Sequence, residues 1–241
     1  MVVAYGDSIT DASSCAEDAP VQCRWGDVLG RRFAQAAMPH VVVTQAIGGN
    51  RLLNRGRGPS ALERFDRDVL AVPGVSHVLL LEGVNDLAGI GPDNPIGAED
   101  LIAGYRQIVA RAREHHLKIF ISPILPWKNS SRHTAEREEV RLAVNNWIRT
   151  SGAFDAVIEF DRVVADPADP SQIAARYNTG DSLHPNADGK IAMANAIDLG
   201  LFRDAPRHTY QANMTGCEKS ATSPTNAHIS STRGRVSPRR H

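Results

Sequence analysis

The chain has 241 residues, 42% of them hydrophobic and 22% charged, which suits one globular α/β domain of about 200 residues with an appendage. The net charge of zero hides an asymmetry, because the segment from Arg207 onward holds six Lys or Arg and one acid, leaving 21 basic and 26 acidic residues before it. An acidic body of this kind argues against a nucleic-acid partner.

Hydrophobic periodicity predicts strands that alternate with helices along the chain. The apolar run 2–5 predicts a first strand, and the amphipathic stretch 24–37 predicts a helix after it. The same alternation continues to the end of the domain. Strands are expected at 41–44, 78–81, 118–121 and 156–160, and helices at 59–70, 98–115, 134–150 and 187–199.

Five strands, each followed by a helix, favour a parallel sheet covered on both faces. Right-handed crossovers then predict a three-layer α/β/α sandwich of the flavodoxin-like kind, occupying residues 1–205. From residue 206 large apolar side chains become rare, so we expect 206–241 to form a basic, disordered C-terminal tail.

No apolar stretch reaches the roughly 20 residues that a membrane span requires, so no transmembrane segment is expected. The N-terminus also lacks the features of a signal peptide. The chain opens directly on the first strand, as a truncated clone would. Localisation therefore stays open: the chain is cytoplasmic as it stands, and secreted if a leader has been removed.

The chain contains three cysteines. Cys15 and Cys23 bracket a polar insert and would close a short loop if oxidised, but the sequence does not name the redox compartment, so this disulfide stays open. There is no zinc-ligand spacing, no glycine-rich phosphate loop and no zinc helix, so neither a metal nor a cofactor is expected.

Polar residues follow several of the predicted strands. In a parallel sheet the carboxyl ends of the strands lie at one edge, and reactive groups are usually found there. Ser8 follows the first strand, and the segment 181–185 supplies Asp181 and His184 three residues apart. A serine, a histidine and an aspartate can serve as nucleophile, base and orienting group. Each residue alone has a plainer explanation, since a serine there can cap a helix and an aspartate can form a turn.

Four segments, in order, resemble the SGNH/GDSL hydrolase family, and the similarity covers about residues 2–200. They are Gly6-Asp7-Ser8-Ile9-Thr10-Asp11, Gly48-Gly49-Asn50-Arg51-Leu52-Leu53, Gly83-Val84-Asn85-Asp86 and Asp181-Ser182-Leu183-His184-Pro185. The chain looks like the hydrolase domain of bacterial members that carry an upstream β-rich domain. Some of those relatives are secreted, which would favour the bridge between Cys15 and Cys23.

The resemblance implies a role for each matching residue. Ser8 would be the nucleophile, His184 its general base, and Asp181 the group that orients the imidazole. The oxyanion hole would consist of the backbone N–H groups of Ser8 and Gly49 and the side-chain amide of Asn85.

We therefore expect a serine esterase that cleaves carboxylic esters, with short acyl chains, through an acyl-enzyme, and whose partner is a small-molecule ester. A carbohydrate O-acetyl esterase with the same triad is an alternative substrate class. A catalytically silent carbohydrate- or glycolipid-binding domain is the alternative from outside the enzymes. The sequence leaves the acyl-chain preference, the alcohol moiety and the oligomeric state open.

Overall fold

The centre of the fold is a five-stranded parallel sheet with the order β2-β1-β3-β4-β5. The computed structural model describes residues 1–11, 15, 22–91 and 93–203. The strands are β1 (Val2–Gly6), β2 (Val42–Ala46), β3 (His77–Leu81), β4 (Lys118–Ile121) and β5 (Ala156–Val157). Strands β1 and β3 are wholly buried, as their continuous apolar runs require of strands covered on both faces.

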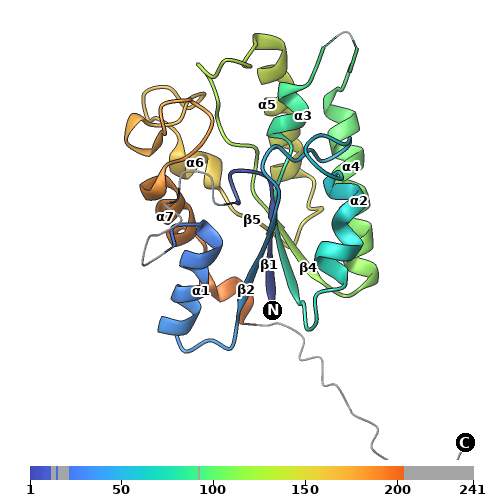
Figure 1. Ribbon diagram of the computed structural model, residues 1–241, viewed down its shortest axis with the longest axis vertical. Helices are drawn as coiled ribbons and strands as arrows, with labels where there is room; N and C mark the ends of the chain where they lie inside the picture. The colour runs from blue at the N-terminus through green and yellow to red at the C-terminus, as the bar shows by residue number, and fades with distance from the viewer. Residues whose placement is uncertain (12–14, 16–21, 92, 204–241) are drawn as a thin grey trace, which may run out of the picture. The chain divides into compact units, whose positions relative to one another are not determined.

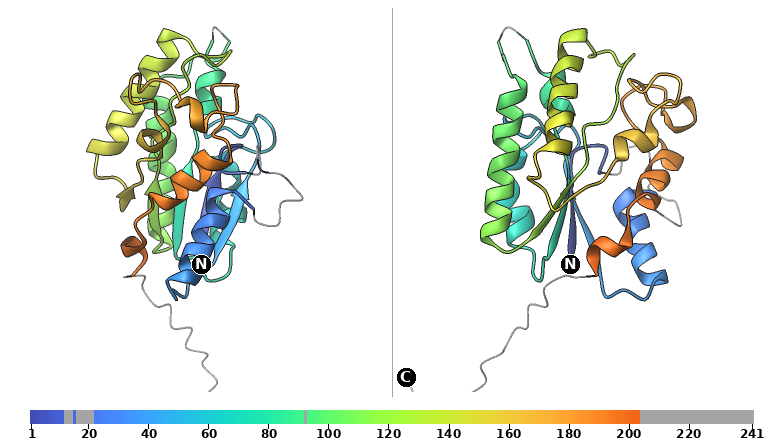
Figure 2. Two further views of the ribbon diagram at one scale, coloured as in Figure 1. Left: turned by 90° about the vertical axis from the view of Figure 1, so that its left-hand side faces the viewer. Right: turned by 180° about the vertical axis from the view of Figure 1, so that it is seen from behind.

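Helices cover both faces of the sheet (Figures 1 and 2). On one side lie α1 (Trp25–Gln35), α6 (Phe160–Val164) and α7 (Ala187–Asn195), and on the other lie α2 (Ala61–Phe65), α4 (Ala98–Glu114) and α5 (Ala135–Thr150). The predicted three-layer α/β/α class is therefore confirmed. The shorter elements are α3 (Val84–Ala88), η1 (Asp66–Leu70), η2 (Ala175–Tyr177) and η3 (Leu199–Phe202).

Two predicted elements differ from the structure. The expected strand 156–160 ends at Val157, because the backbone leaves the extended region at Glu159 and Phe160 begins α6. The expected helix 59–70 is α-helical only over α2 and continues as the π-helix η1, where the N–H of Ala71 bonds the carbonyl of Asp66 five residues back.

The short helices α3 and α6 were not predicted, since five residues are too few for a periodic pattern to show. The predicted tail 206–241 lies outside the described residues. Within the part of the chain that is described, no helix is both long and apolar enough to cross a membrane.

Candidate active site

Ser8 lies in a tight turn directly after β1. The carbonyl of Asp7 accepts hydrogen bonds from the N–H groups of Thr10 and Asp11, and its carboxylate accepts one from Ile9 N–H at 2.8 Å. An aspartate that bonds the backbone two residues on is a typical turn former. Glycine is needed at Gly6, because a Cβ there would lie 2.5 Å from the carbonyl oxygen of Leu81. The turn therefore starts from close contact between β1 and the end of β3.

His184 and Asp181 lie together in the loop that leads into α7. The N–H groups of Leu183 and His184 both donate to Asp181 Oδ1 at 2.9 Å, so the aspartate organises the backbone of its own loop. Asn186 caps α7 by accepting from the N–H of Gly189. The loop is thus fixed at both ends around the imidazole.

Three side chains form a continuous line of hydrogen bonds. Ser8 Oγ is 2.8 Å from His184 Nε2, and His184 Nδ1 is 2.5 Å from Asp181 Oδ2. Partial burial would raise the pKa of Asp181, but the hydrogen bonds from His184 and Leu183 outweigh burial and hold that pKa well below its usual range. Asp181 is therefore a carboxylate that favours a proton on the facing Nδ1, which leaves Nε2 free to accept one.

Two backbone N–H groups, those of Ser8 and Gly49, are available to a ligand. Among the described residues, neither the N–H of Ser8 nor that of Gly49 donates a hydrogen bond. Gly49 has φ +75°, a conformation that favours glycine. The amide of Asn85 donates to the carbonyl of Asn50 at 2.9 Å and to Asp7 Oδ2 at 3.3 Å, so the loops after β1, β2 and β3 meet at this point.

Arg64, on the buried side of α2, lies beneath these loops and was not singled out from the sequence. Its guanidinium donates to the carbonyls of Gly6 and Gln45, at the ends of β1 and β2, and to Asn50 Oδ1. It also contacts Glu82, which follows β3, at 3.2 Å. The sequence did contain one signal, because Arg64 falls on the same face of the helix as the apolar residues Ala61 and Phe65.

Three buried carboxyl groups, those of Asp7, Glu82 and Asp86, lie close to one another near the site. Burial raises the pKa of Asp7 to about 7, against the lowering effect of the Ile9 N–H. Burial also raises the pKa of Asp86 to about 6, although Asp86 accepts from the N–H groups of Leu52 and Leu53. For Glu82, burial and the nearby Asp7 raise the pKa well above its ordinary value. These groups hold the loops together around the site.

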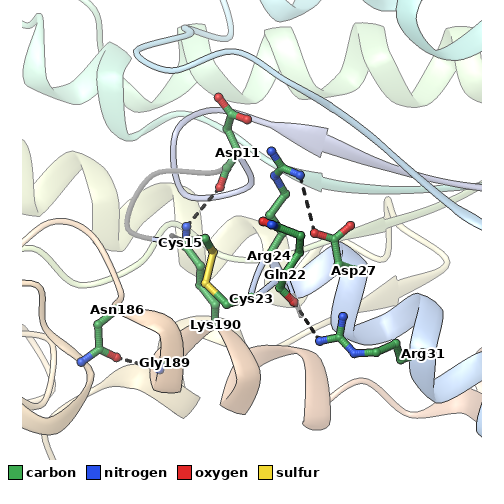
Figure 3. Close-up of a disulfide and its surroundings, with 10 residues drawn as sticks. All are labelled: Asp11, Cys15, Gln22, Cys23, Arg24, Asp27, Arg31, Asn186, Gly189 and Lys190. Carbon is green, nitrogen blue, oxygen red and sulfur yellow. Dashed lines mark hydrogen bonds and ion pairs between the residues drawn. A yellow bond between two sulfur atoms is a disulfide. The ribbon is translucent and has the colours of Figure 1, made fainter. Parts of the chain in front are cut away.

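The segment after Ser8 is tied to α7. Cys15 and Cys23 form a disulfide, and beside it the buried Lys190 of α7 donates to the carbonyl of Asp11 at 3.1 Å (Figure 3). Burial lowers the pKa of Lys190 to about 8. Because α7 follows His184 directly, this contact links the Ser8 segment to the His184 segment.

A hollow of about 450 Å³ adjoins the hydrogen-bonded line. Gly49, Asn85 and Asp181 line it, together with Trp127 and Leu183. Ala88, the last residue of α3, also lines it. Within the described residues, no group of three or more His, Cys, Asp or Glu side chains could hold a metal ion.

Comparison with known proteins places the chain among hydrolases of the three-layer α/β class. The sequence matches the model of the GDSL-like lipase/acylhydrolase family over residues 4–190, and the chain belongs to that family. Among curated proteins, none matches the chain.

Solved structures share the fold at low sequence identity. A GDSL-like lipase from Bacteroides thetaiotaomicron is 17% identical, covers 83% of this chain and 87% of its own, and superposes with a TM-score of 0.57. A psychrotrophic esterase from Pseudoalteromonas sp. is 17% identical, covers 81% and 92%, and has a TM-score of 0.59. An acetyl xylan esterase, also 17% identical, covers 81% and 97% with a TM-score of 0.58.

Proposed function

We propose that this protein is a serine esterase that hydrolyses carboxylic esters through an acyl-enzyme. The observation that carries the proposal is the hydrogen-bonded line from Ser8 Oγ to His184 Nε2, and from His184 Nδ1 to Asp181 Oδ2, beside an open hollow. A serine is activated when its hydroxyl group can hydrogen-bond to an imidazole and a carboxylate holds that imidazole in the correct orientation.

In the first step Ser8 Oγ bonds to the ester carbonyl carbon, and its proton passes to His184 Nε2. The negative charge that develops on the carbonyl oxygen faces the N–H groups of Ser8 and Gly49. Asn85 supplies a third donor when it exchanges its longer hydrogen bond, 3.3 Å to Asp7, for this oxygen. Donors that are in place before charge develops stabilise the transition state most.

The tetrahedral intermediate then collapses. The bond from the carbonyl carbon to the alcohol oxygen breaks, and the alcohol leaves with the proton held on His184 Nε2. A water molecule repeats the sequence on the acyl-enzyme: His184 takes its proton, the hydroxide adds to the acyl carbon, and Ser8 leaves with a proton. The products are a carboxylic acid and an alcohol.

Short acyl chains suit this site best. The hollow is about 450 Å³ and its lining combines the apolar Trp127 and Leu183 with polar groups, whereas a long acyl chain requires a predominantly apolar channel.

The decisive test is hydrolysis of p-nitrophenyl acetate by the wild type and by Ser8→Ala, with Ser151→Ala as the matched control at the end of α5. We expect Ser8→Ala to lose at least about 10³-fold in kcat/KM, and Ser151→Ala to keep the wild-type rate. A fluorophosphonate should label the wild type at one serine and leave Ser8→Ala unlabelled. Equal rates and equal labelling in the two proteins would refute the esterase proposal.

A panel of p-nitrophenyl esters and acetylated sugars separates the remaining alternatives. A preference for acetylated sugars would identify a carbohydrate O-acetyl esterase with the same residues. Absence of turnover on every ester, together with binding of an unmodified sugar or glycolipid, would identify a silent binding domain.

A further inference from the structure

Three arginines line the hollow beside the candidate active site. Arg51 and Arg57 come from the loop between β2 and α2, and Arg132 comes from the loop between β4 and α5. Arg57 and Arg132 are exposed and Arg51 is half-buried. Two separate loops therefore bring three guanidinium groups to one concave surface.

Within the described part of the chain, none of these arginines forms a direct ion pair, although Arg51 lies near enough to the buried Asp86 to lower the pKa of that carboxyl against the raising effect of burial. Among the residues that the structure describes, no carboxylate lies within ion-pair distance of Arg51, Arg57 or Arg132. Several arginines elsewhere in the fold are paired with acids, as Arg149 is with Glu159 and Asp161. The one acid that lines the hollow, Asp181, already accepts from His184. Because the first 206 residues hold more acids than bases, the composition does not account for this cluster.

Glycines give two of the arginines their positions. A Cβ at Gly49 would lie 3.0 Å from Cδ of Arg57, so the side chain of Arg57 crosses directly over Gly49. A Cβ at Gly89 would lie 2.9 Å from Nη2 of Arg51. The missing side chains leave room for both arginines against the backbone. Arg57 is thereby held next to the N–H group proposed to bind the oxyanion.

One neutral donor accompanies the cations. Ser130 lines the hollow between Trp127 and Arg132 in sequence, and its buried hydroxyl has no hydrogen-bond partner among the described residues. Buried hydroxyls are normally hydrogen-bonded, so an unpaired one at this place is unusual.

We propose that the hollow recognises esters that carry a permanent negative charge close to the ester bond. The charged group is a carboxylate or a phosphate. This inference rests on the proposed esterase function and names its substrate class. A guanidinium pairs with carboxylate and phosphate through two parallel N–H donors, and a site with three of them prefers an anionic ester over its neutral counterpart. The charge lies either on the acyl part or on the alcohol part, and the two are distinguished below.

The test compares matched esters in kcat/KM. On the acyl side, p-nitrophenyl hemiglutarate is compared with p-nitrophenyl pentanoate; on the alcohol side, 4-acetoxybenzoate is compared with its methyl ester. The ratio of anionic to neutral ester is measured for the wild type and for Arg51→Gln/Arg57→Gln/Arg132→Gln. We expect the ratio of at least one pair to fall about tenfold in this variant, since charge-assisted bonds to arginine are lost. The pair that responds shows which side carries the charge.

The control variant is Arg106→Gln/Arg113→Gln/Arg203→Gln, which removes the same number of charges from exposed arginines outside the hollow. Its ratios should equal those of the wild type. If the ratio of anionic to neutral ester falls equally in both triple variants, the effect is due to net charge and the proposal is overturned. Unchanged ratios in Arg51→Gln/Arg57→Gln/Arg132→Gln would also overturn it.

A binding measurement separates this proposal from the esterase proposal, because it needs no turnover. The Ser8→Ala protein is titrated with monoethyl glutarate and with ethyl pentanoate by NMR. We expect the anionic ester to bind and the Arg51→Gln/Arg57→Gln/Arg132→Gln change to weaken it about tenfold. If both esters bind equally, the anion proposal is wrong even where ester hydrolysis is observed. If only the anionic ester binds but no ester is cleaved, the esterase proposal alone fails.

Discussion

Arg64 and Glu82 form a fully buried contact beneath the Ser8 turn, with Nη2 of the arginine 3.2 Å from Oε1 of the glutamate. The same guanidinium donates to the carbonyl of Gly6 and to Asn50 Oδ1, and lies over the ring of Tyr5. Asn50 in turn accepts from Asn85. One side chain in the core therefore sets the relative positions of the loops that carry the candidate nucleophile and the oxyanion donors.

Replacing Arg64 should strongly destabilise the fold. Arg64→Met removes the donors of at least four buried acceptors, so we expect the free energy of unfolding to fall by about 3–5 kcal/mol. Urea denaturation of both proteins measures this loss. The matched control is Arg67→Met, three residues along, whose exposed guanidinium pairs with Asp68 and should contribute little to stability. Similar losses in the two variants would show that Arg64 is not the structural centre of the site.

Asp181→Asn should reduce activity without unfolding the protein. The asparagine oxygen can still accept the N–H groups of Leu183 and His184, but its NH₂ group would face His184 Nδ1. Nδ1 must then accept a hydrogen bond, so the ring proton moves to Nε2, which can no longer take the proton of Ser8. We expect kcat to fall about 10³–10⁴-fold with little change in KM.

Thermal denaturation of Asp181→Asn serves as the control for folding. A loss below about tenfold with the fold intact would mean that the carboxylate is not needed to orient His184.

The buried Asp7 should make stability depend on pH. Its pKa is raised by burial from 3.8 to about 7 in the folded protein, so folding favours the protonated form. The stability that this group contributes is complete below about pH 4 and is lost as the pH rises through about 7. As the pH rises from 5 to 7, the free energy of unfolding of the wild type should fall by up to about 1.4 kcal/mol per pH unit more than that of Asp7→Asn. The asparagine cannot ionise, so its variant lacks this contribution.

Urea denaturation in steps of pH measures the two slopes. Glu99→Gln, which removes an exposed carboxylate at the start of α4, is the control and should keep the wild-type slope. If Asp7→Asn also keeps it, Asp7 is not the source of the pH dependence.

The sequence predicted the layers of the fold and the segments that meet at the site, because both leave local patterns. The apolar run of β3 and the helical spacing of α4 depend on burial, which repeats regularly along the chain. The four polar segments follow strands or precede a helix, where a parallel sheet brings them to one edge.

Features that depend on distant partners could not be predicted in the same way. Glu82 directly follows an apolar strand, and its role depends on Arg64, which is 18 residues away on another element. The meeting of Arg51, Arg57 and Arg132 depends on how two loops fold back over glycines. The early end of β5 is followed closely by Glu159 and Asp161, which both bind Arg149 of α5.

Asn85→Ala should slow the chemical step and leave substrate affinity nearly unchanged. The amide that would bind the oxyanion is lost, and removal of one such donor typically costs about 10²–10³-fold in kcat. The same change leaves the carbonyl of Asn50 and Asp7 Oδ2 without this donor, so a stability measurement must accompany the kinetics. Asn54→Ala, on the exposed part of the loop before α2, is the matched control and should leave kcat unchanged. A rise in KM at constant kcat would assign Asn85 to ground-state binding and would remove it from the oxyanion hole.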